Sequence, residues 1–239
     1  MKKLLIGTMV MITMGLTACG SSTVDNTQAE TFTVETAEGK SIQLSKVGNE
    51  SADNLQERKG DYFCIAEDGS KLYYQKDHDD YAYIIRELTQ EQSSTNESQL
   101  VLYQFEGFAE DEDYTLEDDM KIFGLSEVSD IDSVSITNWT QTEGGESETY
   151  YEGKDDETIQ KLYDILYEGQ WINDSDDANP LNSESDISDT LWKISFQLKN
   201  GNEYVMQYYP DYHLVAWYYG NKMIVLDDKS GEWIDSICE

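Results

Sequence analysis

A strict alternation of apolar and polar side chains over residues 192–198 constrains the fold of this chain more than any other feature. The apolar positions are Trp192, Ile194, Phe196 and Leu198, and Lys193, Ser195 and Gln197 lie between them. A period of two is typical of a β-strand with one face in a core and the other in water. Asn200-Gly201 follows, and this dipeptide favours the tight turn of a β-hairpin. The sequence therefore predicts an antiparallel sheet here.

The surrounding sequence extends this hairpin into an α+β domain over residues 111–239. Further strand candidates are residues 131–139, 203–209, 213–219 and 223–226, separated by turn signals such as Pro210-Asp211 and Gly220-Asn221. Between the first of these strands and the hairpin, Ile159, Leu162, Ile165 and Leu166 recur at helical spacing. The sequence predicts an antiparallel meander packed by this one amphipathic helix.

Residues 31–110 predict a second, mainly antiparallel β domain. Its strand candidates are residues 31–34, 41–47, 61–66, 71–75, 81–88 and 100–105, with Glu38-Gly39-Lys40 and Asp68-Gly69 as turns. An acid-rich stretch over residues 106–119 marks the boundary between the domains. A short helix is expected over residues 116–124, with Met120, Ile122 and Phe123 facing inward. The predicted fold class is α+β, with two β-rich domains.

The charge balance excludes one class of partner. With 49 acidic and 16 basic residues, the net charge is −33 at pH 7. Binding to nucleic acid needs a basic face that neutralises phosphates, so no nucleic acid partner is expected. A chain this acidic is also compatible with disorder, but its 17 Tyr, 5 Trp and 6 Phe residues include alternating runs that favour strands. We therefore expect a folded, acidic protein whose surface attracts cations.

The N-terminal segment has the parts of an export signal. Lys2 and Lys3 precede an apolar run over residues 4–16, which is too short to span a bilayer as a permanent helix. The run ends in Leu16-Thr17-Ala18-Cys19, and the polar residues 20–30 after it are typical of a flexible tether.

Leu16-Thr17-Ala18-Cys19 resembles the lipobox of bacterial lipoproteins of the Gram-positive surface type. The resemblance implies that residues 1–18 are a signal peptide and that the Cys19 sulfur carries a diacylglyceryl group. Residues 19–30 would then be a lipidated tether that holds the exported protein on the outer face of the bacterial cell membrane. Residues 131–239 also resemble small α+β domains of uncharacterised surface lipoproteins. This second resemblance implies an accessory protein without known catalysis and transfers no site residues.

Two further cysteines, Cys64 and Cys238, form an even pair. An exported protein is permitted a disulfide, so these two residues are a candidate pair. Cys64 lies in the apolar segment 62–66 and equally fits a buried thiol. Neither cysteine has the basic sequence neighbours that would favour a nucleophilic thiolate.

Three groups of residues are candidates for ligand binding. Residues 174–185 begin like an acidic calcium loop but lack its glycine and its final glutamate, so a looser Ca²⁺ site using Asp174, Asp176, Asp177 and Asp186 is the remaining hypothesis. A second acidic segment, residues 77–80 around His78, fits a polar hairpin end or a cation site. The rings of Tyr208, Trp217 and Tyr219 are candidate ligand-facing aromatics, although alternation turns about half of the rings in this region inward.

These features lead to one functional hypothesis and two alternatives. We expect a non-enzymatic extracytoplasmic lipoprotein that is attached to the lipid bilayer through Cys19 and binds a partner protein or an envelope component such as a glycan. One alternative is an envelope glycan hydrolase, which requires an acid pair lining a cleft. The other is a structural module stabilised by Ca²⁺, and no other cofactor is expected.

Overall fold

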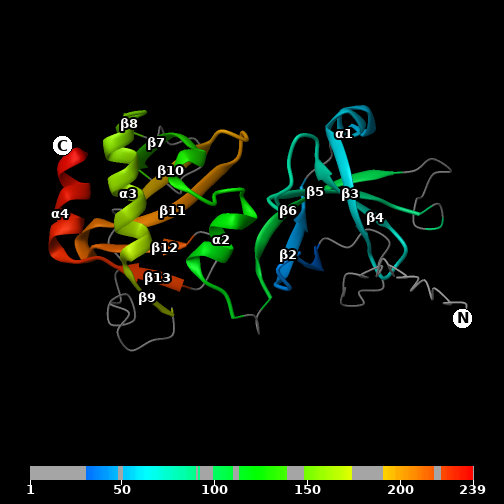
Figure 1. Cartoon of the computed structure of the whole chain (residues 1–239), viewed down its shortest axis with the longest axis horizontal. Helices are drawn as coiled ribbons and strands as arrows, with labels where there is room; N and C mark the ends of the chain where they lie inside the picture. The colour runs from blue at the N-terminus through cyan, green and yellow to red at the C-terminus, as the bar shows by residue number, and fades with distance from the viewer. Residues whose placement is uncertain are drawn as a thin grey trace, which may run out of the picture.

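The computed structural model describes residues 31–47, 51–89, 91, 99–109, 113–138, 148–173, 191–217 and 222–238. Two antiparallel sheets lie on either side of a short central helix, α2 (Figure 1). The first sheet uses strands from the N-terminal half of the chain, and the second uses strands that follow α2. The fold is α+β and mostly β, which confirms the predicted class.

The N-terminal sheet has six strands in the order β1-β2-β6-β5-β4-β3. Their bounds are β1 (Thr31–Glu35), β2 (Ser41–Lys46), β3 (Lys59–Ile65), β4 (Lys71–Gln75), β5 (Tyr83–Glu87) and β6 (Leu100–Phe108). Gly39 and Gly69 occupy the predicted turns with φ of 81° and 83°, a backbone region that favours glycine. Sequence analysis missed α1 (Ala52–Arg58), which covers part of one face by packing Leu55 against Ile85 and Leu102.

A buried arginine lies on the opposite face of this sheet. Arg86 in β5 is 7% exposed, and its guanidinium bonds the carboxylate of Asp68 and the hydroxyl of Ser70. Its central carbon lies 4.9 Å from the centroid of the Phe32 ring. The carboxylate partner and the ring provide the pairing that a buried guanidinium needs.

The C-terminal sheet has seven strands in the order β8-β7-β10-β11-β12-β13-β9. Their bounds are β7 (Ile131–Asn138), β8 (Thr149–Gly153), β9 (Gln170–Asn173), β10 (Trp192–Leu198), β11 (Glu203–Tyr209), β12 (Leu214–Trp217) and β13 (Lys222–Val225). The predicted hairpin is present, with Ile194 opposite Met206 and Phe196 opposite Tyr204. Sequence analysis missed β9, which pairs antiparallel with β13 at the sheet edge.

Helices α3 (Asp156–Glu168) and α4 (Asp228–Ile237) pack on this sheet. The predicted helix is α3, whose Ile159, Leu162 and Leu166 are buried. Sequence analysis missed α4, which contains Gly231 and few apolar residues. The two helices meet where Lys161 Nζ lies 4.0 Å from the centroid of the Trp233 ring. Short 3₁₀ turns cover Val128–Asp130 and Pro210–Tyr212.

Helix α2 (Leu116–Ile122) lies between the two sheets, as Figure 1 shows. It begins with a capping box in which Thr115 Oγ1 accepts from the Asp118 N–H and the Asp118 side chain accepts from the Thr115 N–H. Met120, Ile122 and Phe123 are buried, as predicted. Buried residues of both sheets and of α2 belong to one continuous hydrophobic cluster. The two sheets therefore share a core.

The candidate disulfide between Cys64 and Cys238 is wrong. Cys238 is a free thiol, whereas Cys64 is disulfide-bonded. The pair does not form because the Cys64 sulfur already has another partner. The expected domain boundary between residues 110 and 111 also lies outside the described ranges.

Candidate functional site

A cleft of about 400 Å³ opens between the N-terminal sheet and the segment formed by α2 and the residues that follow it. Its walls come from the turn between β1 and β2, from residues 79–81, from the end of β6, from α2 and from the segment that follows α2. A volume of this size lies within the range of ligand sites in proteins, which often occur at domain interfaces. This cleft is therefore the candidate functional site.

Charged side chains dominate the lining of the cleft. They are the carboxylates Glu38, Asp79, Asp80, Asp118, Glu127 and Asp130 and the amines Lys40 and Lys121. Several of these groups already have partners in the protein. Lys121 pairs with Glu117 at 2.7 Å, and Asp130 Oδ2 accepts from the backbone N–H groups of Ser126 and Glu127. The charge that the cleft can offer to a ligand therefore comes from the side chains that have no salt bridge or hydrogen bond within the protein.

Glu38 and Asp79 are the unpaired carboxylates of the cleft lining. Both are exposed, and among the described residues neither accepts a hydrogen bond. Burial and the hydroxyl of Tyr81 raise the pKa of Tyr74, and Asp79 and Glu38 add smaller contributions, so both carboxylates lie near this ring. Neither carboxylate forms a salt bridge among the described residues, although Glu38, after Glu117 and Asp118, contributes to the raised pKa of Lys121. The open part of the cleft therefore favours a cationic group.

Asp118 binds Lys40 across the interface. The Lys40 amine lies 3.7 Å from Asp118 Oδ2 and donates to the carbonyl of Asp113. Burial opposes ionisation of Asp118, but hydrogen bonds from Thr115 and the nearby Lys40 outweigh this effect and lower its pKa. Asp118 is therefore a charged structural group that connects α2 to the β1–β2 turn.

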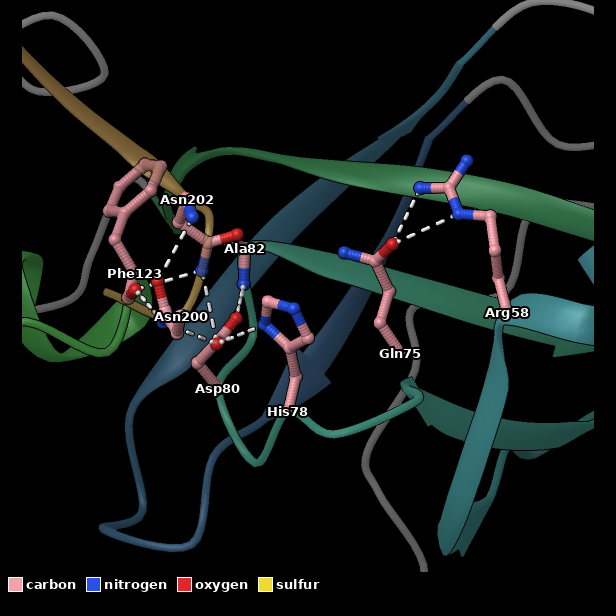
Figure 2. A network of polar contacts seen from close by, with 8 residues as sticks. All are labelled: Arg58, Gln75, His78, Asp80, Ala82, Phe123, Asn200 and Asn202. Atoms are coloured by element: carbon pink, nitrogen blue, oxygen red, sulfur yellow. Dashed lines mark hydrogen bonds and ion pairs between the residues drawn. The ribbon is translucent and has the colours of Figure 1, made fainter. Parts of the chain in front are cut away.

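A buried polar junction at one side of the cleft joins the two halves of the chain (Figure 2). Asp80 Oδ2 accepts from the side-chain amides of Asn200 and Asn202 at 3.2 and 3.0 Å, and it lies 2.9 Å from His78 Nδ1. Both amides also donate to the carbonyl oxygen of Phe123. The tip of the β10–β11 hairpin is thereby fixed to the loop before β5 and to the end of α2.

This junction is not predictable from the local sequence. Residues 77–80 fit a polar hairpin end or a cation site, and Asn200-Gly201 fits a turn. In the structure, His78 bonds Asp80, and the described residues contain no group of three or more ligands that could hold a metal ion. Polar side chains at two hairpin ends gave no signal that they meet, because the contact joins positions 120 residues apart.

No known protein identifies this site. The chain matches no family model, no curated protein and no solved structure.

Two of the three candidate ligand-facing aromatics are buried. Tyr208 is 0% exposed and Trp217 is 2% exposed, so both belong to the core. The hydroxyl of Tyr208 donates to Asp235 of α4 at 2.9 Å, which explains why this ring faces inward. Tyr219 lies outside the described residues, as do Cys19 and the candidate calcium ligands Asp174, Asp176, Asp177 and Asp186.

A cysteine, a histidine and an aspartate come together near the C-terminus. His213 Nε2 lies 3.5 Å from Asp235 Oδ2. The Asp235 carboxylate is also close enough to Cys238 to change the pKa of its thiol. Burial and the negative charge of Asp235 raise the pKa of the Cys238 thiol to about 12. A nucleophilic cysteine needs the opposite shift, because the thiolate is the reactive form. This cluster is therefore not a nucleophilic site.

Asp119 is a carboxyl group with a strongly perturbed acidity. It is 2% exposed, and burial, with a smaller contribution from Asp118, raises its pKa to about 7, although the hydrogen bond from Tyr204 opposes the shift. A glycan hydrolase needs such a group in contact with its substrate. Asp119 does not line the cleft. It therefore does not supply the acid that this alternative requires.

Proposed function

We propose that this chain is an exported lipoprotein, anchored to the outer face of a bacterial membrane through Cys19, that binds a partner protein or an envelope component without catalysis. The observation that carries the binding role is the cleft of about 400 Å³ between the N-terminal sheet and α2. The anchoring rests on the sequence of residues 1–19 alone. None of the described helices has the length and apolar character that a membrane span requires.

The charges of the cleft suggest which part of a partner it binds. Glu38 and Asp79 line the cleft without a salt bridge among the described residues. Their charges favour an amine or guanidinium group, and the volume fits a side chain or a small headgroup better than an extended chain. The proposed ligand is therefore a cationic group displayed by a larger protein or envelope component.

Site-specific photocrosslinking on intact cells tests the cleft. A photoreactive amino acid at position 126, where Ser126 is exposed and lines the cleft, is expected to give a discrete adduct, and Glu38→Gln in the same chain is expected to reduce its yield severalfold. The same photoreactive residue at position 57 is the control, since Glu57 is exposed on α1 and does not line the cleft. Equal adducts from positions 126 and 57 would rule out the cleft as the binding site.

The lipid anchor has its own test. Cells labelled with an alkyne fatty acid are expected to incorporate label into the wild-type protein and not into Cys19→Ala. Label that persists in the variant would contradict lipidation at this residue.

A further inference from the structure

Asp119 occupies the middle of α2 and faces the C-terminal sheet. The hydroxyl of Tyr204 in β11 donates to Asp119 Oδ2 at 2.7 Å. The other carboxyl oxygen, Oδ1, is buried and has no hydrogen-bond partner among the described residues. Tyr204 is 1% exposed, so the contact is shielded from water. The site therefore suits a neutral carboxyl group better than a carboxylate.

Helix α2 is also the element that joins the two sheets. Phe123, directly after α2, packs its ring 5.7 Å from Phe105 of β6 and 5.4 Å from Tyr204 of β11, measured between centroids. The carbonyl of Ile122 accepts from the N–H of Tyr81, and that of Phe123 accepts from both Asn200 and Asn202. A shift of α2 away from β11 would therefore disturb contacts to both sheets.

We infer that ionisation of Asp119 loosens α2 from the C-terminal sheet and so weakens the interface between the two sheets. The carboxylate form would leave a charge in a dry site with one hydrogen bond, and opening α2 would let water reach it. Removal of a proton would thus favour the opened state. Because Asp118, Lys121 and Ile122 of α2 line the cleft, the opened state would also have a different cleft wall.

Few titratable groups face this contact. Tyr204 faces Asp119 from β11, and Asp118 is its neighbour on α2. Tyr114, in the segment before α2, adds a small contribution to the raised pKa of Tyr204, after burial and Asp119. The amine of Lys222 in β13 lies 4.3 Å from the centroid of the Tyr114 ring. Burial lowers the pKa of Lys222. None of these groups places a cation against the Asp119 carboxyl.

The direction of the pH effect follows from the acidity of Asp119. Its pKa is raised from 3.8 to about 7 in the closed state. An exposed aspartate ionises at the lower value, so the closed state binds the extra proton between these limits. The equilibrium constant for opening is expected to rise about tenfold per pH unit in this window and to level off above it. Stability is therefore lost as pH rises from about 4 to about 7.

Hydrogen exchange of the α2 amides tests this inference without any ligand, so its outcome is independent of the proposed function. After correction for intrinsic exchange rates, protection in α2 is expected to fall at least tenfold from pH 5 to pH 8 in the wild type. Asp119→Asn should abolish this fall. Helix α3 serves as the internal control, and an equal loss of protection in α3 would indicate global unfolding and overturn the inference.

Tyr204→Phe keeps the experiment decisive if the asparagine variant does not fold. The hydrogen bond from Tyr204 lowers the pKa of Asp119, so its removal should move the midpoint of the pH effect upward. The side-chain carboxyl carbon of Asp119, followed by NMR, reports this midpoint directly. An unchanged midpoint, or α2 protection that does not vary with pH in the wild type, would refute the role of Asp119.

Discussion

At the scale of single residues, the contact between His213 and Gly231 leaves no room for a methyl group. A Cβ atom on Gly231 would lie 2.1 Å from His213 Cγ, which is far inside van der Waals contact. His213 itself has φ of 45°, a left-handed conformation that non-glycine residues rarely adopt. The ring also lies 3.5 Å from Asp235. A helical glycine and a strained histidine are thus explained by the same close approach of α4 to the sheet.

This close approach predicts that Gly231→Ala lowers the stability of the wild type but raises the stability of a protein that lacks the His213 ring. Gly231→Ala should destabilise the wild type by about 1–3 kcal/mol, because the added methyl overpacks the site. In a His213→Gly background, the same change should stabilise by about 1 kcal/mol, because alanine is the better helix former. Urea denaturation of the four proteins measures both effects. The same destabilisation in both backgrounds would show that the histidine ring is not the obstacle.

At the scale of elements, the tip of the β10–β11 hairpin does more than reverse the chain. Asn202 is 5% exposed, and its amide donates to both Asp80 and the Phe123 carbonyl. Gly201 beside it has φ of 94°, and a Cβ atom added at this position would meet nothing within 4 Å, so this glycine serves only the turn. Asn202 therefore makes the contact between the two halves of the chain, whereas its neighbour Gly201 provides only the geometry of the hairpin turn.

Mutations at these two positions should differ in how far their effects extend. Asn202→Ala should cost about 1–3 kcal/mol, because it leaves buried polar groups with fewer partners. It should also shift the amide resonance of Ala82, whose N–H donates to Asp80 Oδ1. Gly201→Ala should cost about 1 kcal/mol through backbone strain and leave that resonance in place. A shift of the Ala82 amide in both variants would contradict this separation.

At the scale of the whole molecule, the shared core joins both sheets. Phe105 of the N-terminal sheet, Phe123 after α2 and Tyr204 of the C-terminal sheet lie in successive ring contacts. The buried residues of both sheets belong to one cluster. Domains with separate cores often unfold separately, whereas a continuous core favours one cooperative transition.

The positions of the tryptophans allow a direct test of this cooperativity. All 5 Trp residues of the chain follow residue 138, so tryptophan fluorescence reports the C-terminal half alone. Far-ultraviolet circular dichroism reports both sheets. We expect the two urea transitions to have the same midpoint at pH 6. A fluorescence transition clearly separated from the dichroism transition would mean that the sheets unfold independently.

Local patterns predicted the elements that carry a strong period. The alternation in β10, the turn at Asn200-Gly201 and the helical spacing of α3 each depend on residues close together in the chain, so the sequence contained the whole signal. Helices α1 and α4 and strand β9 were missed because they are short or poor in apolar residues. Their packing against distant elements stabilises them, and this information is not local.

The sequence by itself determined the α+β class, the two sets of strands and the inward face of α2. Only the tertiary structure decided that the two sheets share a core, that Tyr208 and Trp217 are buried, and that Glu38 and Asp79 face one cleft. The physical reason is the range of the interactions involved. Period and turn chemistry act over a few residues, whereas burial, charge pairing and cleft formation depend on residues that only folding brings together.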